Sequence, residues 1–576
     1  MKMFPKIYKY ALMLAVALTV TQALQAQVED ERERPVTVDS FNIVRDYKPL
    51  LADAVKIRRS PDMSNKRSYM PKLSYNDVTD QKLDINTGLK ELDVREMPFA
   101  VRENILSNYV KVGVGNFNTF LGEAYLSVED YEDMRVGGFV KHLGQKGSLD
   151  QQKFSKQDVG VFGRRIMNGF TLDGLAGFNR YGTHFYANPV AENGDLLNPD
   201  KAEQVFSNLY FTGELTSNYD PDDAEAISYS AKLDAFSFKD KYATSETGVN
   251  IAAYFNKRIQ AFNIGANVSA DIGSHEGVNS GGSVGKVNNS IAVLNPYIRF
   301  KGDNYAVTLG ANLIPEFGDS TGFNVFPVAE VDFSLVPEYL HLFGGVKGSV
   351  ERGSFKKFAV ENPYLGQELD IRNTIERMGF YGGLKGNMGA TFGYKAKLFY
   401  KQLENMPMFV LDAENPHQFQ LIYDGDEDKA VKHIGLEGEM NVRVSELLNL
   451  GGRFNFDDYT LANEKEAWNL PKLRLTAMAR FTLSEKLFID AEALFTSERF
   501  SKAYNYADGS VSSLISQDAQ KSLPTFFDLS ASAEYKATSQ LGVFVKANNM
   551  LNTEYEKYIY YPKLGFNFLG GINFSF

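Results

Sequence analysis

The stretch LRLTAMARFTL at positions 473–483 alternates apolar and polar residues along its whole length, with Met478 as the one exception. Successive side chains of a β-strand point to opposite faces of the sheet, so the stretch predicts a strand with one apolar and one polar face. Strands of soluble proteins run about 5–6 residues, whereas a tilted strand that crosses a membrane needs about 9–11. The eleven residues of this stretch therefore favour a membrane-spanning strand.

The same alternation recurs at 227–235, 392–401 and 434–444, where Phe399 is the one apolar residue on a polar face. Counting comparable segments from about residue 105 to the C-terminus gives about 22 strands, within a range of roughly 18–26. An open sheet edge in hydrocarbon would leave backbone groups without partners, and closing the sheet removes that edge. We therefore expect residues 105–576 to form an all-β, transmembrane antiparallel β-barrel.

The composition supports this fold class and excludes others. The 576 residues include 43 Phe, 31 Tyr and 48 Gly but no Cys, so the chain has no disulfide framework and no lipidated cysteine. Beyond the first 27 residues, no apolar run reaches the roughly 20 residues that a membrane helix needs. A net charge of -11 argues against binding to nucleic acid. A soluble propeller or solenoid is the alternative, but no repeat of about 40–50 residues is present.

The connections between the predicted strands alternate in length. Short turns are predicted at 128–133 and 445–449. Long polar loops are predicted at roughly 183–203, 273–290, 351–375, 403–430 and 497–524. Short turns on one side and long loops on the other are typical of outer-membrane barrels, in which the long loops face outward.

The N-terminus predicts export. Lys2, Lys6 and Lys9 precede an apolar stretch at 11–20, and cleavage after Ala26 would remove a signal peptide at 1–26. Residues 27–104 are charged and rich in Pro, Lys and Asp. We interpret them as an N-terminal strap or reduced plug-like segment in the periplasm or the lumen, with a short helix near 50–57.

The C-terminal stretch FNFLGGINFSF at 566–576 alternates again and ends on an aromatic residue. We interpret it as the barrel-assembly signal that the outer-membrane insertion machinery reads, carried by Phe566, Phe568, Phe574 and Phe576. Upstream stand NMLN at 549–552, then Tyr555, Pro562 and Gly565. This arrangement resembles the last two strands of TonB-dependent outer-membrane receptors, except that Phe566 replaces the Arg of that family.

The resemblance implies a barrel in the outer membrane of a Gram-negative bacterium that transports or gates a solute. The family carries an α/β plug before its barrel, and residues 27–104 are short for one and lack its glycine-rich strands. Barrels of about 22 strands enclose a wide, usually plugged lumen. We therefore expect the strap, or a partner lipoprotein or periplasmic protein, to fill this one.

Two further functions stand beside transport. One is a structural or assembly component of an outer-membrane complex with a partner protein. The other is an outer-membrane hydrolase, but no H-E-x-x-H motif is present among the six His. We therefore expect no enzymatic activity, no cofactor and no metal, and membrane lipid as a partner.

Charged residues on the polar faces of the strands are the candidate functional residues. They are Lys232, Asp234, Lys395, Lys397, Glu437, Glu439, Arg443, Arg474, Arg480, Asp490 and Glu492. Facing a pore, they would set its selectivity. The alternative interpretation is a salt-bridge network that fills the interior, and the sequence leaves both open.

Three other motifs receive structural interpretations. GGSVGK at 281–286 looks like a phosphate loop, but its glycines are one residue too close, and Val287 stands where Ser or Thr would hold Mg²⁺. We predict an outer loop there. The acidic cluster Asp220, Asp222 and Asp223 and the cluster at 424–428 lack the spacing of a calcium loop, so we predict solvated hairpin ends.

Overall fold

The computed structural model describes residues 108–576, apart from 132, 188, 190–199, 219–226, 260–261, 279–283, 390, 414, 503–504, 507–510 and 514–519. The predicted signal peptide, the strap at 27–104 and its helix near 50–57 lie outside the described residues. So do Asp220, Asp222 and Asp223.

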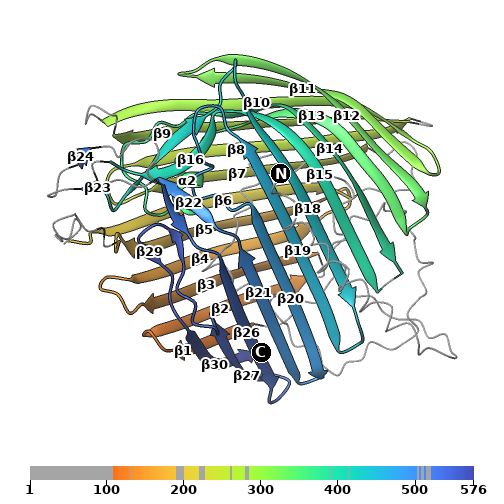
Figure 1. The fold of residues 1–576 in the computed structure, drawn as a ribbon. Coiled ribbons are helices and arrows are strands. Elements are labelled where there is room, and N and C mark those ends of the chain that lie inside the picture. Colours follow the sequence, from red (N-terminus) through yellow and green to blue (C-terminus); the bar gives the residue numbers. More distant parts are fainter. Residues whose placement is uncertain are drawn as a thin grey trace, which may run out of the picture. The chain divides into compact units, whose positions relative to one another are not determined.

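In the described part of the chain, 22 strands form one sheet (Figure 1). The first eleven are β1 (Tyr109–Gly115), β2 (Thr119–Tyr131), β3 (Met134–Lys146), β4 (Lys153–Ile166), β5 (Phe170–His184), β6 (Glu203–Ser217), β7 (Ile227–Lys239), β8 (Ser245–Ile259), β9 (Phe262–Val278), β10 (Val284–Lys301) and β11 (Tyr305–Gly318). The others are β12 (Gly322–Val336), β13 (Leu340–Glu351), β14 (Thr374–Met388), β15 (Phe392–Glu404), β18 (Val431–Arg443), β19 (Leu448–Thr460), β20 (Leu473–Ser484), β21 (Leu487–Thr496), β26 (Phe526–Lys536), β27 (Leu541–Asn548) and β30 (Asn567–Ser575).

The sheet closes because its first and last strands pair. β1 lies antiparallel to β30, with partners from Tyr109↔Ser575 to Gly115↔Leu569, and Figure 1 shows the two strands side by side. Glycine permits this close approach, because a Cβ atom at Gly115 would overlap the carbonyl oxygen of Phe568. The predicted closed antiparallel barrel of about 22 strands is confirmed.

Where the alternation is regular, a strand presents an apolar face outward and a polar face inward, as the pattern predicts. On β18, Ile434 and Met440 are 46% and 52% exposed on the outer surface, while Glu437 faces the lumen. Phe399, the apolar exception on β15, also faces inward and is only 5% exposed. Its ring lies over Gly435, where a Cβ atom would overlap it, and meets the ring of His433 edge-on at 4.9 Å. The glycine therefore makes room for the inward aromatic residue.

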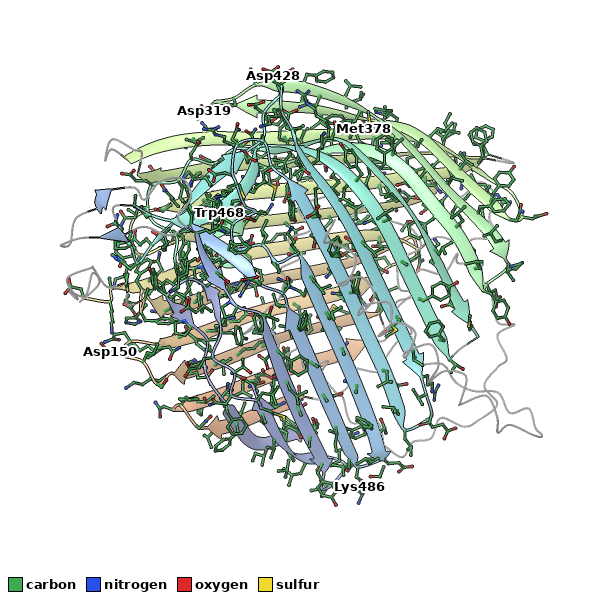
Figure 2. All side chains as sticks on the ribbon, viewed as in Figure 1. Asp150, Asp319, Met378, Asp428, Trp468 and Lys486 are labelled. Atoms are coloured by element: carbon green, nitrogen blue, oxygen red, sulfur yellow. The ribbon has the colours of Figure 1, made fainter. Side chains whose placement is uncertain are left out.

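The two ends of the barrel differ, and we call them the short-turn end and the long-loop end. The connections at the short-turn end include 167–169, 302–304 and 485–486. The large connections all lie at the other end, at 185–202, 352–373, 405–430, 461–472, 497–525 and 549–566. Figure 2 labels Trp468, before β20 at the long-loop end, and Lys486, just after β20 at the short-turn end.

The prediction of a long loop at 273–290 is wrong. β9 continues to Val278 and β10 starts at Val284, and the two strands pair through this region with partners such as His275↔Val287. GGSVGK at 281–286 is likewise not wholly a loop, because Gly285 and Lys286 belong to β10. Polar residues occupy both faces of this segment, with Ser274 opposite Asn288 and Glu276 opposite Lys286 on one face and His275 on the other, so it lacks the alternation that marks strands elsewhere. The long connections at 461–472 and 549–566 were not predicted as loops.

Small elements occupy the long connections. They are α2 (Phe355–Glu361), β16 (Met406–Leu411), β17 (Phe419–Asp424), β22 (Arg499–Lys502), β23 (Asn505–Tyr506), β24 (Val511–Ser513), β25 (Gln520–Leu523), β28 (Glu556–Tyr558) and β29 (Tyr561–Pro562). Among the described residues, no helix is both long and apolar enough to cross a membrane.

Candidate functional site

The connections at the long-loop end pack together into one structure, which we call the cap. Its hydrophobic core contains buried residues from the barrel rim and from five of the large connections. They are Tyr186, Ala187, Phe206, Phe238, Phe355, Phe358, Ala359, Leu365, Phe409, Leu411, Phe419, Leu421, Leu523, Tyr558, Ile559 and Tyr561. Because these residues come from all along the barrel sequence, the cap joins loops that belong to distant wall strands.

Tyrosine side chains connect three of these loops. The rings of Tyr364 and Tyr561 stack with their centroids 3.6 Å apart, and the ring of Tyr186 meets Tyr561 edge-on at 5.0 Å. Burial raises the pKa of Tyr364 and of Tyr561 well above the usual range, so both phenols remain neutral. A neutral phenol can donate a hydrogen bond, and the Tyr561 hydroxyl donates to the carbonyl oxygen of His417 at 2.6 Å.

A buried ion-pair cluster, which we call the latch, fixes α2 to the barrel wall. The guanidinium of Arg352 donates to Glu246 at 2.8 Å and to Asp271 at 2.8 Å. Glu246 is 1% exposed and Arg352 is 4% exposed. The other oxygen of Glu246 accepts from the Ser354 hydroxyl and from the Lys356 backbone N–H, each at 2.8 Å. Glu246 on β8 thus accepts hydrogen bonds from the first residues of α2, which follows β13.

The sequence explains why α2 begins at this point. Ser354 is its N-cap, with an extended backbone and a hydroxyl that accepts from the backbone N–H of Lys357. Phe355 and Phe358 then bury their rings in the core of the cap. Ser354, a residue that favours the N-cap position, precedes Phe355 and Phe358, which are three residues apart. This pattern could have predicted the short helix from the sequence.

A second junction joins the hairpin of β16 and β17 to the connection at 461–472. The carboxylate of Asp424 is 1% exposed and accepts from the backbone N–H groups of Ala462 at 2.7 Å and Asn463 at 2.9 Å. Trp468, the single tryptophan, is buried beside them and donates from its ring nitrogen to Glu464 at 2.7 Å. Asp424, predicted as part of a solvated hairpin end, is instead a buried structural carboxylate.

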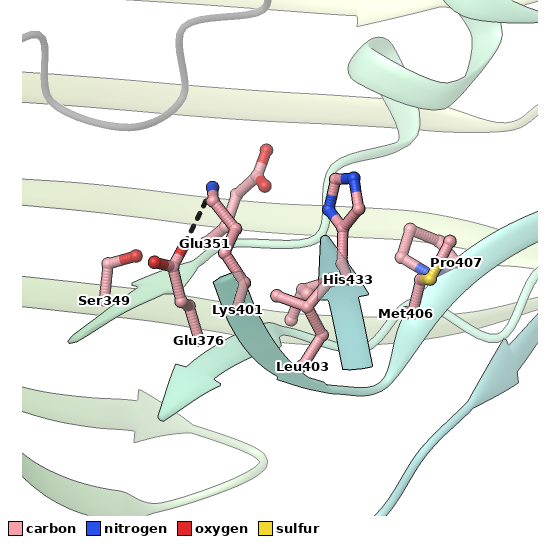
Figure 3. Close-up of a pocket in the computed structure, with 9 residues that line it drawn as sticks. Ser349, Glu351, Glu376, Lys401, Leu403, Met406, Pro407 and His433 are labelled. Carbon is pink, nitrogen blue, oxygen red and sulfur yellow. Dashed lines mark ion pairs between the residues drawn. The ribbon is translucent and has the colours of Figure 1, made fainter. Parts of the chain in front are cut away.

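A pocket of about 250 Å³ lies on the inner wall beside the first residues of β16, Met406 and Pro407 (Figure 3). Its lining is mixed in character. The residues are Ser349, Glu351, Thr374, Glu376, Lys401, Leu403, Met406, Pro407 and His433. The ammonium of Lys401 pairs with Glu376 at 3.0 Å, and the ring nitrogen Nε2 of His433 lies 2.8 Å from the carboxylate of Asp457. The pocket therefore combines charged and polar groups with an apolar side formed by Leu403, Met406 and Pro407.

The structure places all eleven candidate lumen residues on the face opposite the exposed apolar one. Three pairs of them form ion pairs, Lys397–Glu437 at 3.0 Å, Arg480–Asp490 at 2.7 Å and Lys232–Asp234 at 3.1 Å. Glu439 pairs at 3.7 Å with Arg453, which the sequence reasoning missed. Lys395, Arg443 and Arg474 form no ion pair with another described residue.

The lumen charges that form ion pairs are not buried. Side-chain exposure is 51% for Arg480 and 47% for Asp490, and 50% for Arg453 and 48% for Glu439. Ions or solutes in the lumen can therefore reach them. Glu492 also has a polar contact and lies opposite Met478, the exception on β20, which faces the lumen as well.

The C-terminal aromatic residues line one face of β30. Phe566, Phe568, Phe574 and Phe576 are all 40% or more exposed on the outer surface. Their role as an assembly signal remains a prediction. In the described part of the chain, no group of three or more His, Cys, Asp or Glu side chains could hold a metal ion.

Comparisons with known proteins support the fold. No protein-family model matches the chain, and no curated protein matches it in sequence. The FrpB iron transporter from Neisseria meningitidis (F3-3 variant) matches with a TM-score of 0.62 at 10% identity, over 82% of this chain and 81% of that chain. The ferripyoverdine receptor of the outer membrane of Pseudomonas aeruginosa matches with a TM-score of 0.60 at 13% identity, over 82% and 72%.

The ferric-catecholate import receptor Fiu from K12 E. coli gives a TM-score of 0.59 at 11% identity, over 82% of both chains. These structural neighbours are receptors and transporters rather than enzymes. The resemblance to TonB-dependent receptors, inferred from the C-terminal strands, is confirmed at the level of the fold. The chain is thus a 22-stranded barrel with the fold of receptors from the Gram-negative outer membrane.

Proposed function

We propose that the barrel carries a solute across the outer membrane through its lumen, and that the cap gates the long-loop end. The observation that carries this proposal is the combination of an inner wall of accessible charges with a cap above it. The apolar outer surface can contact lipid. The half-exposed ion pairs of the inner wall, such as Arg480–Asp490, can line a water-filled path through the lumen. The neighbours with this fold include an iron transporter and an import receptor, which favours transport here.

The inner wall is the candidate for selectivity. Rings of charged side chains select the ions and solutes that cross a pore. The pairs Lys397–Glu437 and Glu439–Arg453 lie next to each other on β15, β18 and β19 and line a second, smaller pocket. Opposite charges at such short spacing favour a polar solute over a strongly charged one.

Residues 27–104 are the proposed plug of the lumen. They precede β1, which enters the sheet at the short-turn end, whereas the cap lies at the other end. A barrel of 22 strands has a wide lumen that would leak without a filling segment. The strap, alone or with a periplasmic partner, would close the short-turn side.

Single-channel recording in a planar bilayer tests the proposal. Three proteins are compared: the full mature chain, a chain without residues 27–104, and that deletion combined with replacement of 406–424 by a short Gly-Ser linker. Transport predicts little current for the first and the largest steady current for the third. Equal, negligible current for all three, with intact barrels by heat-modified gel mobility, would contradict it.

The second candidate is a structural component of an outer-membrane complex. It is favoured by the cap itself, because the latch and the tyrosine stack join loops from distant wall strands into one structure. Purification from native outer membranes after mild cross-linking tests this function. A stoichiometric lipoprotein or periplasmic partner would support it, and recovery of the barrel alone would exclude it.

A further inference from the structure

A row of polar residues crosses the outer face of β3 to β7 near the long-loop end. Strand pairing places His142 opposite Gln157, Gln157 opposite Arg180, Arg180 opposite Ser207, and Ser207 opposite Lys239. Hydrogen bonds link three of its members, because Arg180 donates to Gln157 at 3.4 Å and Gln157 lies 3.3 Å from the His142 ring nitrogen.

The next outward row, two residues closer to the short-turn end, is apolar on β3 to β6 and ends on Ser237 of β7. Its apolar members are Val140, Val159, Phe178 and Leu209, which are 52%, 46%, 43% and 62% exposed. Two residues of a strand span about 7 Å. The surface therefore changes from apolar to polar within one step, which places the polar row at the level of the lipid headgroups.

Cations gather above this boundary. Lys146 and Lys153 face outward, are exposed, and are direct partners across β3 and β4. Like charges directly opposite each other destabilise a sheet. With Arg180 and the exposed Lys239 they form a group that we call the basic rim. None of its four members forms an ion pair with a described residue.

The nearby acidic side chains are already paired. Glu203 pairs with Lys241 at 2.9 Å, and Asp150 pairs with Lys201 at 3.2 Å. On another part of the outer surface, Lys286 on β10 lies opposite Glu276 on β9. The basic rim has no such opposite charge facing it across the described strands, in a chain whose net charge is -11.

We propose that the basic rim binds the phosphate-bearing headgroups of lipids in the leaflet at the long-loop end. The acyl chains of such a lipid would contact the apolar row below, and its phosphates would relieve the repulsion between Lys146 and Lys153. A lipid is the partner that fits, because the cations adjoin a surface that hydrocarbon must cover. This inference does not depend on the proposed transport.

Binding of diphosphorylated lipid A to the purified mature protein in phosphatidylcholine nanodiscs, followed by native mass spectrometry, tests the proposal. Lys146→Gln, Lys153→Gln and Lys239→Gln are combined in one variant. The matched control combines Arg165→Gln, Lys301→Gln and Lys486→Gln, which removes three exposed cations near the short-turn end. Each basic side chain near an anionic membrane surface strengthens binding about fivefold, so the rim variant should bind at least roughly tenfold more weakly.

Binding is also measured with dephosphorylated lipid A, and with diphosphorylated lipid A in the presence of inorganic phosphate as a competitor. Headgroup recognition predicts that the rim variant and the unaltered protein bind the dephosphorylated lipid equally, and that inorganic phosphate at millimolar concentration does not compete. Equal weakening in the rim and control variants would overturn the proposal, as would weakening that is the same for both lipids. Competition by free phosphate would assign the rim to a soluble anion instead.

Discussion

Tyr364 and Tyr561 stack with their ring centroids 3.6 Å apart, although one follows β13 and the other follows β27. Both rings contribute to the core of the cap, so the loops around them are held as one unit rather than as separate surface segments. Predictions about the cap therefore concern several loops at once.

Replacing Tyr561 with Ala should loosen the cap while leaving the barrel intact. Truncating a buried aromatic side chain typically costs about 3–5 kcal/mol. Hydrogen exchange should become faster at 352–373 and 405–424 and stay unchanged in the wall strands. Tyr339→Ala, at a site that is 51% exposed at the short-turn end, is the control. Unchanged exchange in both connections would show that the stack does not hold them.

Breaking the latch should release α2. Glu246→Gln leaves the buried Arg352 with Asp271 alone, and removing one partner of a buried ion pair typically costs about 3–5 kcal/mol. Protease cleavage within 352–373 should become faster. The double variant Glu246→Leu and Arg352→Met removes both charges and should recover much of the protection. Equal cleavage in the single and double variants would argue against a buried charge as the cause.

Exchanging the charges of Lys397 and Glu437 tests the inner wall. Lys397→Glu alone should shift the reversal potential of the chain without residues 27–104 toward cation selectivity, and adding Glu437→Lys should restore it. Stability should change little, because exposed ion pairs contribute about 0–1 kcal/mol. An unchanged reversal potential in both variants would show that Lys397 and Glu437 do not line the path of the ions.

Gly435→Ala should destabilise the barrel, because its Cβ atom would overlap the ring of Phe399. Overpacking of this kind costs about 1–3 kcal/mol. The midpoint of thermal unfolding, read from gel mobility, should fall. Gly438→Ala on the same strand meets nothing closer than 3.7 Å and serves as the control. Adding Phe399→Leu should rescue Gly435→Ala, and a failure to do so would point to a backbone effect.

Removing Phe576 should reduce the amount of barrel that reaches the outer membrane, if the C-terminal strand is read during assembly. Phe566→Ser, at the other end of the same exposed face, should have a smaller effect. Quantifying both variants in outer-membrane fractions distinguishes an assembly defect from general loss of an apolar side chain.

The wall could be predicted from sequence because lipid imposes a pattern on it. At 434–444 and 473–483, outward residues must be apolar and inward residues are mostly polar, so period-two alternation reports both the strand and its orientation. The same reasoning placed Lys397, Glu437, Arg480 and Asp490 on the inner face. It failed at 273–290, where polar residues stand on both faces of the paired strands and the pattern is lost.

The cap could not be predicted in this way. Glu246 lies in a strand and Arg352 in a loop more than one hundred residues later, and nothing in either local sequence marks the pairing. Asp424 likewise looked like one of several acidic residues at a hairpin tip, although its carboxylate is buried. Such contacts depend on how loops from different strands pack together, and the local sequence pattern of one loop does not predict that packing.

The shared core of the cap restricts how the exposed face of this protein can change over evolution. Loops normally tolerate variation, but a substitution in one of these loops disturbs its neighbours as well. Escape from phages or antibodies would therefore concentrate at tips outside the core, such as the exposed segment 426–429. A binding agent directed at the loop surface next to the core would therefore meet residues whose substitution disturbs several loops at once.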